Sequence, residues 1–346
     1  MSVEGAARTI TRFCSLFRSH HSEPWSAPQP MLSELHYQDR AATTLRRVID
    51  GTLTSPLLLL GSEGVGRKHS VVCMMRELLC AGDRTASCAC ASCFQIAKGI
   101  HPDILIVGSE AERVGVDAVR AVIAAVQEYP TASPFTCVVI DGADNFASGD
   151  ASDMLLKALE EPASRTRYFL LAERRESVSP TIRSRCVEVW YRNLPAEFIV
   201  SMVSQKTRDA NALVYGRMGE GSLGRALQYA YSGKLSVRDH MLKLLEAVAA
   251  RDLAATFSLA DSAMEDANVG VRVVRQLLED IILANSDPDR AINVDLQVEL
   301  RELGARSAPE MWLSIWTRVH ALQEQMRTTR VAATFHLKSI FAETFV

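Results

Sequence analysis

The sequence predicts an α/β domain with a five-stranded parallel sheet, followed by helical segments that continue to the C-terminus. Five short apolar runs alternate with segments of helical periodicity between residues 35 and 194. Strands in such an alternating order form a parallel sheet with both faces covered by helices. Beyond residue 194 the apolar runs end, and amphipathic helical patterns replace them.

The elements of the α/β part follow one another with clear boundaries. A helical pattern over residues 35–54 ends at Ser55-Pro56, directly before the apolar run 57–60. A glycine-rich turn, Gly61 to Gly66, then leads into a helix over residues 68–79. We expect the remaining strands and helices of this part at 103–107, 135–140, 167–171 and 186–191, and at 116–128 and 152–161 respectively.

The helical remainder divides at a turn, Tyr231-Ser232-Gly233. We therefore expect a small helical domain over residues 195–234 and a larger one over 235–346. The larger domain is expected to contain helices over 237–248, 253–264, 271–284, 294–303 and 308–345.

Residues 1–30 contain arginines and serines but no apolar stretch of a secretory signal. We expect folded structure to begin near Met31. Three interpretations of residues 1–30 stay open: a disordered extension, translation from a start codon upstream of the true one, or a transit peptide.

Composition excludes several classes of protein. The 346 residues are 48% hydrophobic, which excludes disorder of the whole chain. The 38 Lys and Arg nearly balance the 41 Asp and Glu, so any contact with nucleic acid is expected to be local. The apolar runs are much shorter than the roughly 20 residues that span a bilayer. We expect no contact with a membrane, and a cytoplasmic protein.

The turn after the first strand has the glycine frame of a phosphate-binding loop. Gly61, Gly64 and Gly66 fit the pattern G-x-x-x-x-G-K-[ST], whose backbone N–H groups cradle phosphate. The next two residues should be Lys and a Ser or Thr that holds Mg²⁺, but here they are Arg67 and Lys68. The glycines then serve either the shape of the turn alone or a weak binding of nucleotide without turnover.

The second element of a nucleotide site is an apolar strand that ends in Asp-Glu. The strand before Asp141 fits, but Gly142 stands where the catalytic carboxylate should be. A glycine cannot polarise water. We therefore expect that this chain does not hydrolyse ATP with Mg²⁺.

The order of these motifs resembles that of the AAA+ clamp-loader subunits of bacterial DNA polymerase III. The resemblance extends over about residues 35–194 and includes the glycine loop, a cysteine cluster, His101-Pro102-Asp103, Val139-Ile140-Asp141, the run Leu-Leu-Lys-Ala-Leu-Glu-Glu-Pro at 155–162, and Thr-Ile-Arg-Ser-Arg-Cys at 181–186. It implies an AAA+ domain over 31–194, a helical lid over 195–234 and a helical collar for oligomerisation over 235–346.

Within that family the chain looks like the delta-prime subunits rather than the ATPase motor subunits. The motors carry a Thr where this chain has Glu173, and an Arg directly after Gly-Ser-Leu, whereas here Arg225 comes one place late. The resemblance implies a non-hydrolysing stator of a pentameric loader that places the sliding clamp on primed DNA, with the ATPase and delta subunits as partners. Two alternatives stay open: a gamma/tau-like motor with an atypical phosphate loop, and a zinc-containing AAA+-like adaptor outside the clamp loader.

The resemblance also implies a role for Arg185 in the motif Ser184-Arg185-Cys186. In the family this arginine reaches the ATP of the adjacent subunit, and such a finger accelerates phosphoryl transfer by about 10³ to 10⁵. The alternative is an ion pair with a carboxylate of its own chain. For DNA, Arg113 and Arg120 near the start of the helix at 116–128 are candidates, and a solvated helix face is the alternative.

Four of the eight cysteines crowd into residues 80–93. Cys80, Cys88, Cys90 and Cys93 have the composition of a closed, structural Zn²⁺ site. Only one residue separates Cys88 from Cys90, and this spacing departs from the family pattern. A different fourth ligand, Cys73 or His101, and free core thiols therefore remain alternatives.

Overall fold

The computed structural model describes residues 31–108, 113–146, 148–232, 235–262, 267–284, 286–328 and 333–345. The expectations for residues 1–30 lie outside this part of the chain. The chain divides into two compact units, Met1–Leu194 and Pro195–Val346.

The first unit contains a parallel sheet of five strands. The strands are β1 (Leu57–Leu60), β2 (Ile104–Val107), β3 (Thr136–Asp141), β4 (Thr166–Ala172) and β5 (Val187–Trp190). Their order in the sheet is β2-β3-β4-β1-β5, and every neighbouring pair is parallel. The predicted five-stranded parallel sheet is confirmed.

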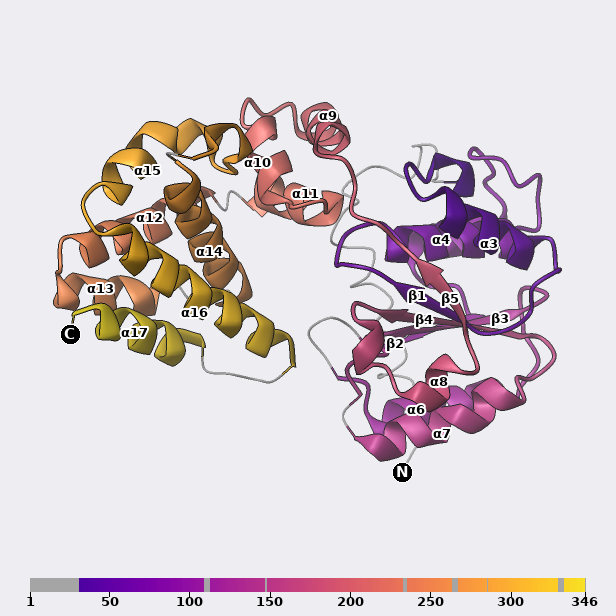
Figure 1. Ribbon diagram of the computed structural model, residues 1–346. Coiled ribbons are helices and arrows are strands. Elements are labelled where there is room, and N and C mark those ends of the chain that lie inside the picture. The colour runs from indigo at the N-terminus through magenta and orange to yellow at the C-terminus, as the bar shows by residue number, and fades with distance from the viewer. Residues whose placement is uncertain are drawn as a thin grey trace. The chain divides into compact units, whose positions relative to one another are not determined.

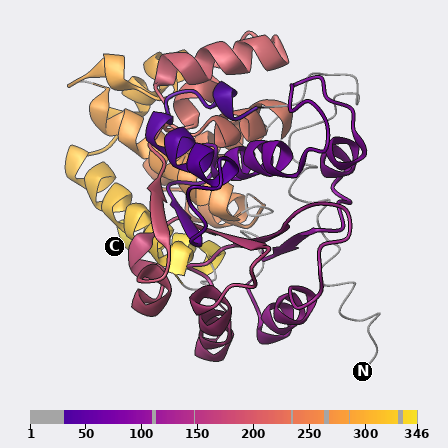
Figure 2. The ribbon, with the colours of Figure 1, turned by 90° about the vertical axis from the view of Figure 1, so that its right-hand side faces the viewer.

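Helices cover both faces of this sheet (Figures 1 and 2). The helices α3 (Asp39–Ile49) and α4 (Arg67–Leu79) pack on one face, whereas α6 (Val116–Ala125), α7 (Gly149–Glu160) and α8 (Pro180–Arg183) pack on the other. A short helix, α5 (Ala91–Lys98), follows α4 in the chain. The helix expected over 35–54 begins only at Asp39, because Tyr37 adopts a left-handed φ of 61° that no continuous α-helix contains.

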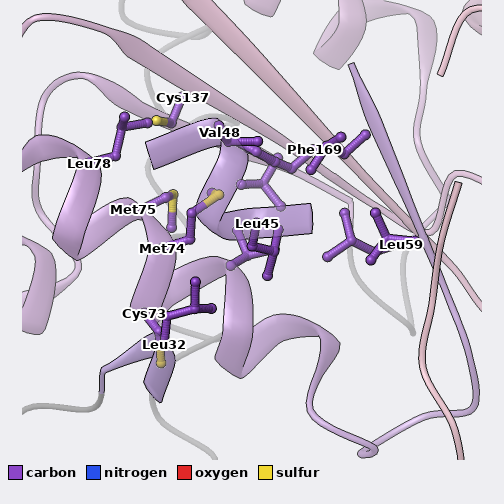
Figure 3. Close-up of a cluster of buried hydrophobic side chains, with 14 of the residues drawn as sticks. Leu32, Leu45, Val48, Leu59, Cys73, Met74, Met75, Leu78, Cys137 and Phe169 are labelled. Carbon is purple, nitrogen blue, oxygen red and sulfur yellow. The ribbon is translucent and has the colours of Figure 1, made fainter. Parts of the chain in front are cut away.

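The two faces of the sheet bury different residues of the same strand. In β1, Leu57 and Leu59 belong to the core below α3 and α4, and Leu58 and Leu60 belong to the opposite core. This alternation follows from the two-residue repeat of a strand. Figure 3 shows the first core, where side chains of the two helices meet those of the strands: Leu45, Val48, Met74, Met75 and Leu78 with Leu59, Cys137 and Phe169.

The second unit is helical. Its helices are α9 (Ala196–Thr207), α10 (Ala212–Met218), α11 (Leu223–Ser232), α12 (Leu235–Ala249), α13 (Leu253–Ser262), α14 (Ala267–Leu283), α15 (Gln297–Gly304), α16 (Pro309–Thr328) and α17 (Ala333–Ala342). The single helical segment expected over 308–345 is two helices, α16 and α17. Among the described helices, none combines the length and the apolarity needed to cross a membrane.

Polar contacts connect the helices of the two domains expected within this unit. The side-chain amide of Gln276 in α14 donates to the carbonyl of Met218 in α10 at 2.9 Å, and Gln276 is fully buried. Buried amides are stable when they are hydrogen-bonded. The contact helps to hold α10 and α14 in one compact unit, and the finer division into lid and collar stays a prediction.

Candidate functional site

The glycine loop lies between the end of β1 and the start of α4. A Cβ atom at Gly61 would lie 2.9 Å from the Cβ and carbonyl oxygen of Tyr191, so this position tolerates only glycine. Gly64 and Gly66 adopt φ values of 72° and 111°, which glycine reaches without steric strain. The shape of the turn therefore requires these glycines.

Two cations at the start of α4 face two carboxylates at the carboxyl edge of the sheet. The Lys68 Nζ lies 2.9 Å from Oδ2 of Asp141, the last residue of β3. An Arg67 Nη2 lies 3.9 Å from Oε1 of Glu173, which directly follows β4. The Asp141 and Arg67 side chains are only 3% and 6% exposed. We name Arg67, Lys68, Asp141 and Glu173 the charge cluster.

Magnesium fits this cluster poorly. Mg²⁺ prefers oxygen ligands in near-ideal octahedral geometry, but the side chain that faces Asp141 ends in an ammonium group. The position of the catalytic base is Gly142, which has no side chain to activate water. The described residues at this edge therefore offer no second oxygen ligand from the start of α4 and no carboxylate base at position 142.

Asp144 fixes the segment that carries Glu173, and the sequence analysis did not single it out. Its Oδ2 accepts hydrogen bonds from the backbone N–H groups of Glu173 at 2.9 Å and Arg174 at 3.1 Å. The turn residue thus sets where β4 ends and where the Glu173 side chain starts. An aspartate three residues beyond a strand end is a common turn residue, and this was the signal available in the sequence.

Arg185 lies at the opposite edge of the sheet. It precedes β5, whose first residue, Val187, pairs with Leu57 at the start of β1. The glycine loop instead follows the last residue of β1. Because a strand rises about 3.3 Å per residue, these two edges are about 13 Å apart. Arg185 therefore lies at the end of the strands opposite to the phosphate loop of its own chain.

The guanidinium of Arg185 is bound within its own chain. Its Nε donates to Oε1 of Glu160 at 2.7 Å, and Nη2 donates to the same oxygen. Its Nη1 donates to the carbonyl of Thr181 at 2.9 Å. Both charged side chains are partly exposed, at 32% for Arg185 and 46% for Glu160. The pairing within the chain that the sequence left open is present, and solvent reaches it.

The four cysteines of residues 80–93 come together as one cluster. Their sulfur atoms all lie within 4.8 Å of one another. The Cys80 sulfur lies 3.5 Å from that of Cys88 and 3.9 Å from that of Cys90. A tetrahedral metal with bonds of about 2.3 Å to sulfur would separate the sulfurs by about 3.8 Å. Cys80, Cys88, Cys90 and Cys93 therefore form a set that can hold a metal ion.

Cys73 and His101, the alternative fourth ligands, do not belong to the cysteine cluster in the described part of the chain. Cys73 is fully buried in the core, and burial raises the pKa of its thiol to about 12. The His101 ring is also buried, and its Nδ1 accepts a hydrogen bond from the backbone N–H of Asp103 at 3.2 Å. The short spacing between Cys88 and Cys90 does not prevent both sulfurs from joining the cluster.

Two further residues shape the cysteine loop, and the sequence analysis did not single them out. The buried Arg76 of α4 donates to the carbonyls of Thr85 at 2.7 Å and Ala86 at 3.0 Å. Gly82 donates its N–H to the sulfur of Cys80 at 3.3 Å. A Cβ atom at Gly82 would lie only 2.6 Å from the sulfur of Cys88. A glycine within a cysteine-rich loop was the available signal for this close approach.

The His101-Pro102-Asp103 motif has a structural role. The carboxylate of Asp103 accepts hydrogen bonds from the backbone N–H groups of Thr131 at 2.7 Å and Ala132 at 2.8 Å, and from the Ser133 hydroxyl at 2.8 Å. Burial raises the pKa of Asp103, but these hydrogen bonds outweigh it and hold the pKa below its ordinary value. Asp103 therefore organises the loop that precedes β3.

The remaining candidate arginines all have polar partners. Arg113 donates to the side-chain oxygen of Asn145 at 3.1 Å, and Arg120 pairs with Asp117 at 2.7 Å on an exposed face of α6. Arg225 is buried, with an Nη1 3.9 Å from Oε2 of Glu220. Arg225 thus lies inside the helical unit rather than on its surface.

Comparison with known proteins agrees with the fold and the order of these motifs. Residues 37–195 match the family described as DNA polymerase III, delta subunit. The delta-prime subunit of Escherichia coli DNA polymerase III is 28% identical over 277 residues, which cover 78% of this chain and 82% of that protein. The delta-prime subunit of Pseudomonas aeruginosa is 32% identical over 135 residues, or 38% of this chain and 41% of that protein.

Other relatives are gamma/tau subunits of DNA polymerase III by name. The gamma/tau subunit of Mycobacterium tuberculosis DNA polymerase III is 28% identical over 291 residues, so that 75% of this chain matches half of that longer protein. The crystal structure of a gamma-subunit-related protein from Thermotoga maritima is 18% identical, with a TM-score of 0.47, and the match covers 84% of this chain and all of that one.

The parallel sheet, the glycine loop after its first strand and the helical unit that follows have the architecture of an AAA+ protein, as the sequence predicts. The chain is similar to subunits of DNA polymerase III over these stretches, and the delta-prime subunit of E. coli is among them.

The cysteine loop generates a testable prediction. Gly82→Ala should lower the metal content of the purified chain after dialysis, because the added methyl group would displace the sulfur of Cys88 from the cluster. Metal per chain is measured by atomic emission. Gly149→Ala is the matched control, since a Cβ atom there meets nothing within 4 Å. Equal metal content in the two variants would contradict the prediction.

Proposed function

We propose that this chain is a delta-prime-like, non-hydrolysing stator subunit of the DNA polymerase III clamp loader. The observation that carries the proposal is the carboxyl edge of the sheet, where Lys68 engages Asp141 and position 142 is a glycine. An ATPase needs a Mg²⁺ ligand and a group that orients water at these positions. The similarity to the E. coli delta-prime subunit over 82% of its length supports the same role.

The stator acts on a neighbouring subunit through Arg185. The opposite edge of the sheet presents this guanidinium away from its own loop, which suits a residue that serves another chain. When it leaves Glu160, the guanidinium neutralises negative charge that develops on the γ-phosphate of the neighbour's ATP. The present partner is a solvent-exposed carboxylate, and exposed pairs of this kind are weak enough to exchange for a phosphate.

The cysteine cluster holds Zn²⁺ in a structural site. Cys80, Cys88, Cys90 and Cys93 would supply four thiolates, which fill the tetrahedral coordination and leave no position for substrate. Cys80 ends α4 and Cys93 lies in the first turn of α5, so the site would fasten these two helices together. The metal would contribute to folding and not to chemistry.

The proposed assembly is a pentameric ring with the ATPase subunits and the delta subunit, which acts on the sliding clamp and primed DNA in the cytoplasm. Within it, residues 195–234 serve as the lid and 235–346 as the collar. Arg113 and Arg120 are the proposed local contacts to the DNA backbone, since they are exposed and their partners are weak surface groups. Co-purification with the other subunits separates this assembly from an adaptor outside the clamp loader.

The second candidate, a gamma/tau-like motor, is favoured by the match to the M. tuberculosis subunit over 75% of this chain. The motors of the family carry an Arg directly after Gly-Ser-Leu, whereas here Arg225 comes one place late. Arg225 is buried beside Glu220. Together with the charge cluster, this burial makes the stator the better-supported role.

ATP turnover distinguishes the two roles. We expect the purified chain to show no ATP hydrolysis above background with Mg²⁺, because the residues at positions 68 and 142 cannot supply the metal ligand and the base. Phosphate release from ATP is measured at steady state. Robust hydrolysis that disappears in Asp141→Asn would establish the motor role instead.

The zinc site has its own test. We expect about one zinc per chain, and Cys93→Ser should release it and lower the melting temperature, because structural zinc contributes directly to folding. Cys186→Ser is the matched control, as its thiol lies outside the cluster. A metal-free chain with an unchanged melting temperature would refute a structural zinc.

The role of Arg185 is tested in the complete assembly. Arg185→Ala should leave folding and zinc content intact, because a partly exposed ion pair adds little stability. It should lower the clamp- and DNA-stimulated ATPase only in part, since the other motor sites receive arginines from other subunits, whereas the affected site slows by up to about 10³ to 10⁵.

Glu160→Ala is the control for this test. It removes the same ion pair but keeps the guanidinium, so the ATPase should remain. ATPase and clamp-loading rates are measured on reconstituted complexes with equal amounts of each variant. Unchanged rates with Arg185→Ala would leave this chain without a role in its neighbour's chemistry.

A further inference from the structure

The contact between Lys68 and Asp141 occupies a specific place in the phosphate-loop architecture. In a working loop, Mg²⁺ is held by the hydroxyl of the second residue after the last glycine, and the aspartate at the end of a neighbouring strand helps to hold it. Lys68 and Asp141 stand at those two positions. Here they meet directly, with 2.9 Å between the Lys68 Nζ and the Asp141 Oδ2.

We propose that the Lys68 ammonium takes the place of Mg²⁺ as a built-in counter-ion of Asp141, and that it excludes divalent cations from the phosphate loop. At 2.9 Å the ammonium and the carboxylate oxygen form a close ion pair. A magnesium ion needs its oxygen ligands at about 2.0–2.1 Å, and it would have to displace the ammonium to reach this carboxylate. The Lys68 ammonium and a magnesium ion would repel each other if both lay beside Asp141.

Because Asp141 is buried, replacing the Lys68 ammonium by a divalent ion has a large energetic effect. The Asp141 side chain is 3% exposed, and a buried carboxylate is tolerated only when it is paired and hydrogen-bonded. Lys68 is 32% exposed, so its stem enters from the solvent side while its charged end lies on Asp141. Removing the lysine charge takes away the cation that lies 2.9 Å from Oδ2 of Asp141, and a divalent ion is then more favourable at that position than it is beside the ammonium.

The neighbouring pair supports the same electrostatic balance. Arg67, 6% exposed, faces Glu173 at 3.9 Å, so the charge cluster contains two positive and two negative side chains. In a loop that binds Mg²⁺ and a nucleoside triphosphate, the bound ligand supplies the charges that neutralise the side chains of the loop. The charge cluster is balanced by its own side chains and needs no ligand for this balance.

Metal rescue of a variant tests the inference on the full, zinc-loaded chain and does not require the proposed assembly. Melting temperature is measured in metal-free buffer and again with millimolar Mg²⁺. The wild type should melt at one temperature in both. Lys68→Ser, which restores a hydroxyl beside Asp141, should melt lower without Mg²⁺ and recover with it. Lys68→Ser combined with Asp141→Asn should show no recovery.

Lys157→Ser is the matched control, because this lysine is exposed on α7 and lies outside the charge cluster; it should respond to Mg²⁺ no more than the wild type. Binding is measured in parallel with Mn²⁺ by electron paramagnetic resonance. Wild-type Mn²⁺ binding that disappears in Asp141→Asn would overturn the inference. So would a Lys68→Ser variant that melts like the wild type and ignores Mg²⁺.

A second variant, Lys68→Gln, tests the inference if Lys68→Ser does not fold. Lys68→Gln keeps a hydrogen-bond donor near Asp141 but removes the charge, and it should bind Mn²⁺ more tightly than the wild type does. Equal Mn²⁺ binding by the two would refute the inference. ATP hydrolysis is a separate readout: turnover by the wild type would defeat the stator role, whereas the melting and Mn²⁺ results decide the role of Lys68.

Discussion

Parallel strands give the first unit two chemically different edges, and the arrangement of its charged residues depends on this constraint. All five strands run in one direction, so the residues that follow them gather at the carboxyl edge and those that precede them gather at the other. The charge cluster lies at the first edge, and Arg185 with Glu160 lies at the second. The glycine loop of a chain can thus be catalytically inactive while the same chain carries an exposed arginine at the opposite edge of the sheet.

Much of the fold could be predicted from the sequence because a sheet that is buried on both faces produces a simple pattern in its strands. A strand that is buried on both faces is a continuous apolar run, and β1 lies where the run of four leucines placed it. Boundaries were less certain where a single backbone angle decides them. The left-handed φ of Tyr37 moves the start of the expected first helix to Asp39, and hydrophobic periodicity does not report such an angle.

The site was predictable where spacing along the chain carried the information. The glycine frame and the cysteine set were found in this way. Contacts between distant segments were not, because they depend on how the strands are ordered in the sheet. The pairing of Lys68 with Asp141 and of Arg185 with Glu160 joins residues that only the folded sheet brings together. Arg76 escaped notice for another reason: its partners are backbone carbonyls, which leave no trace in side-chain identity.

Helix α4 connects the two candidate sites of the first unit mechanically. It begins after the glycine loop, ends at Leu79 directly before Cys80, and is buried along most of its 13 residues, so it forms a stiff rod of about 20 Å. The rod is tied at one end by the Lys68 ion pair and at the other by the cysteine cluster and Arg76. A helix anchored at both ends resists rotation about its axis and sliding along the sheet. The glycine loop at the start of this helix is therefore held in place from both ends of α4, and it contains its own counter-ion.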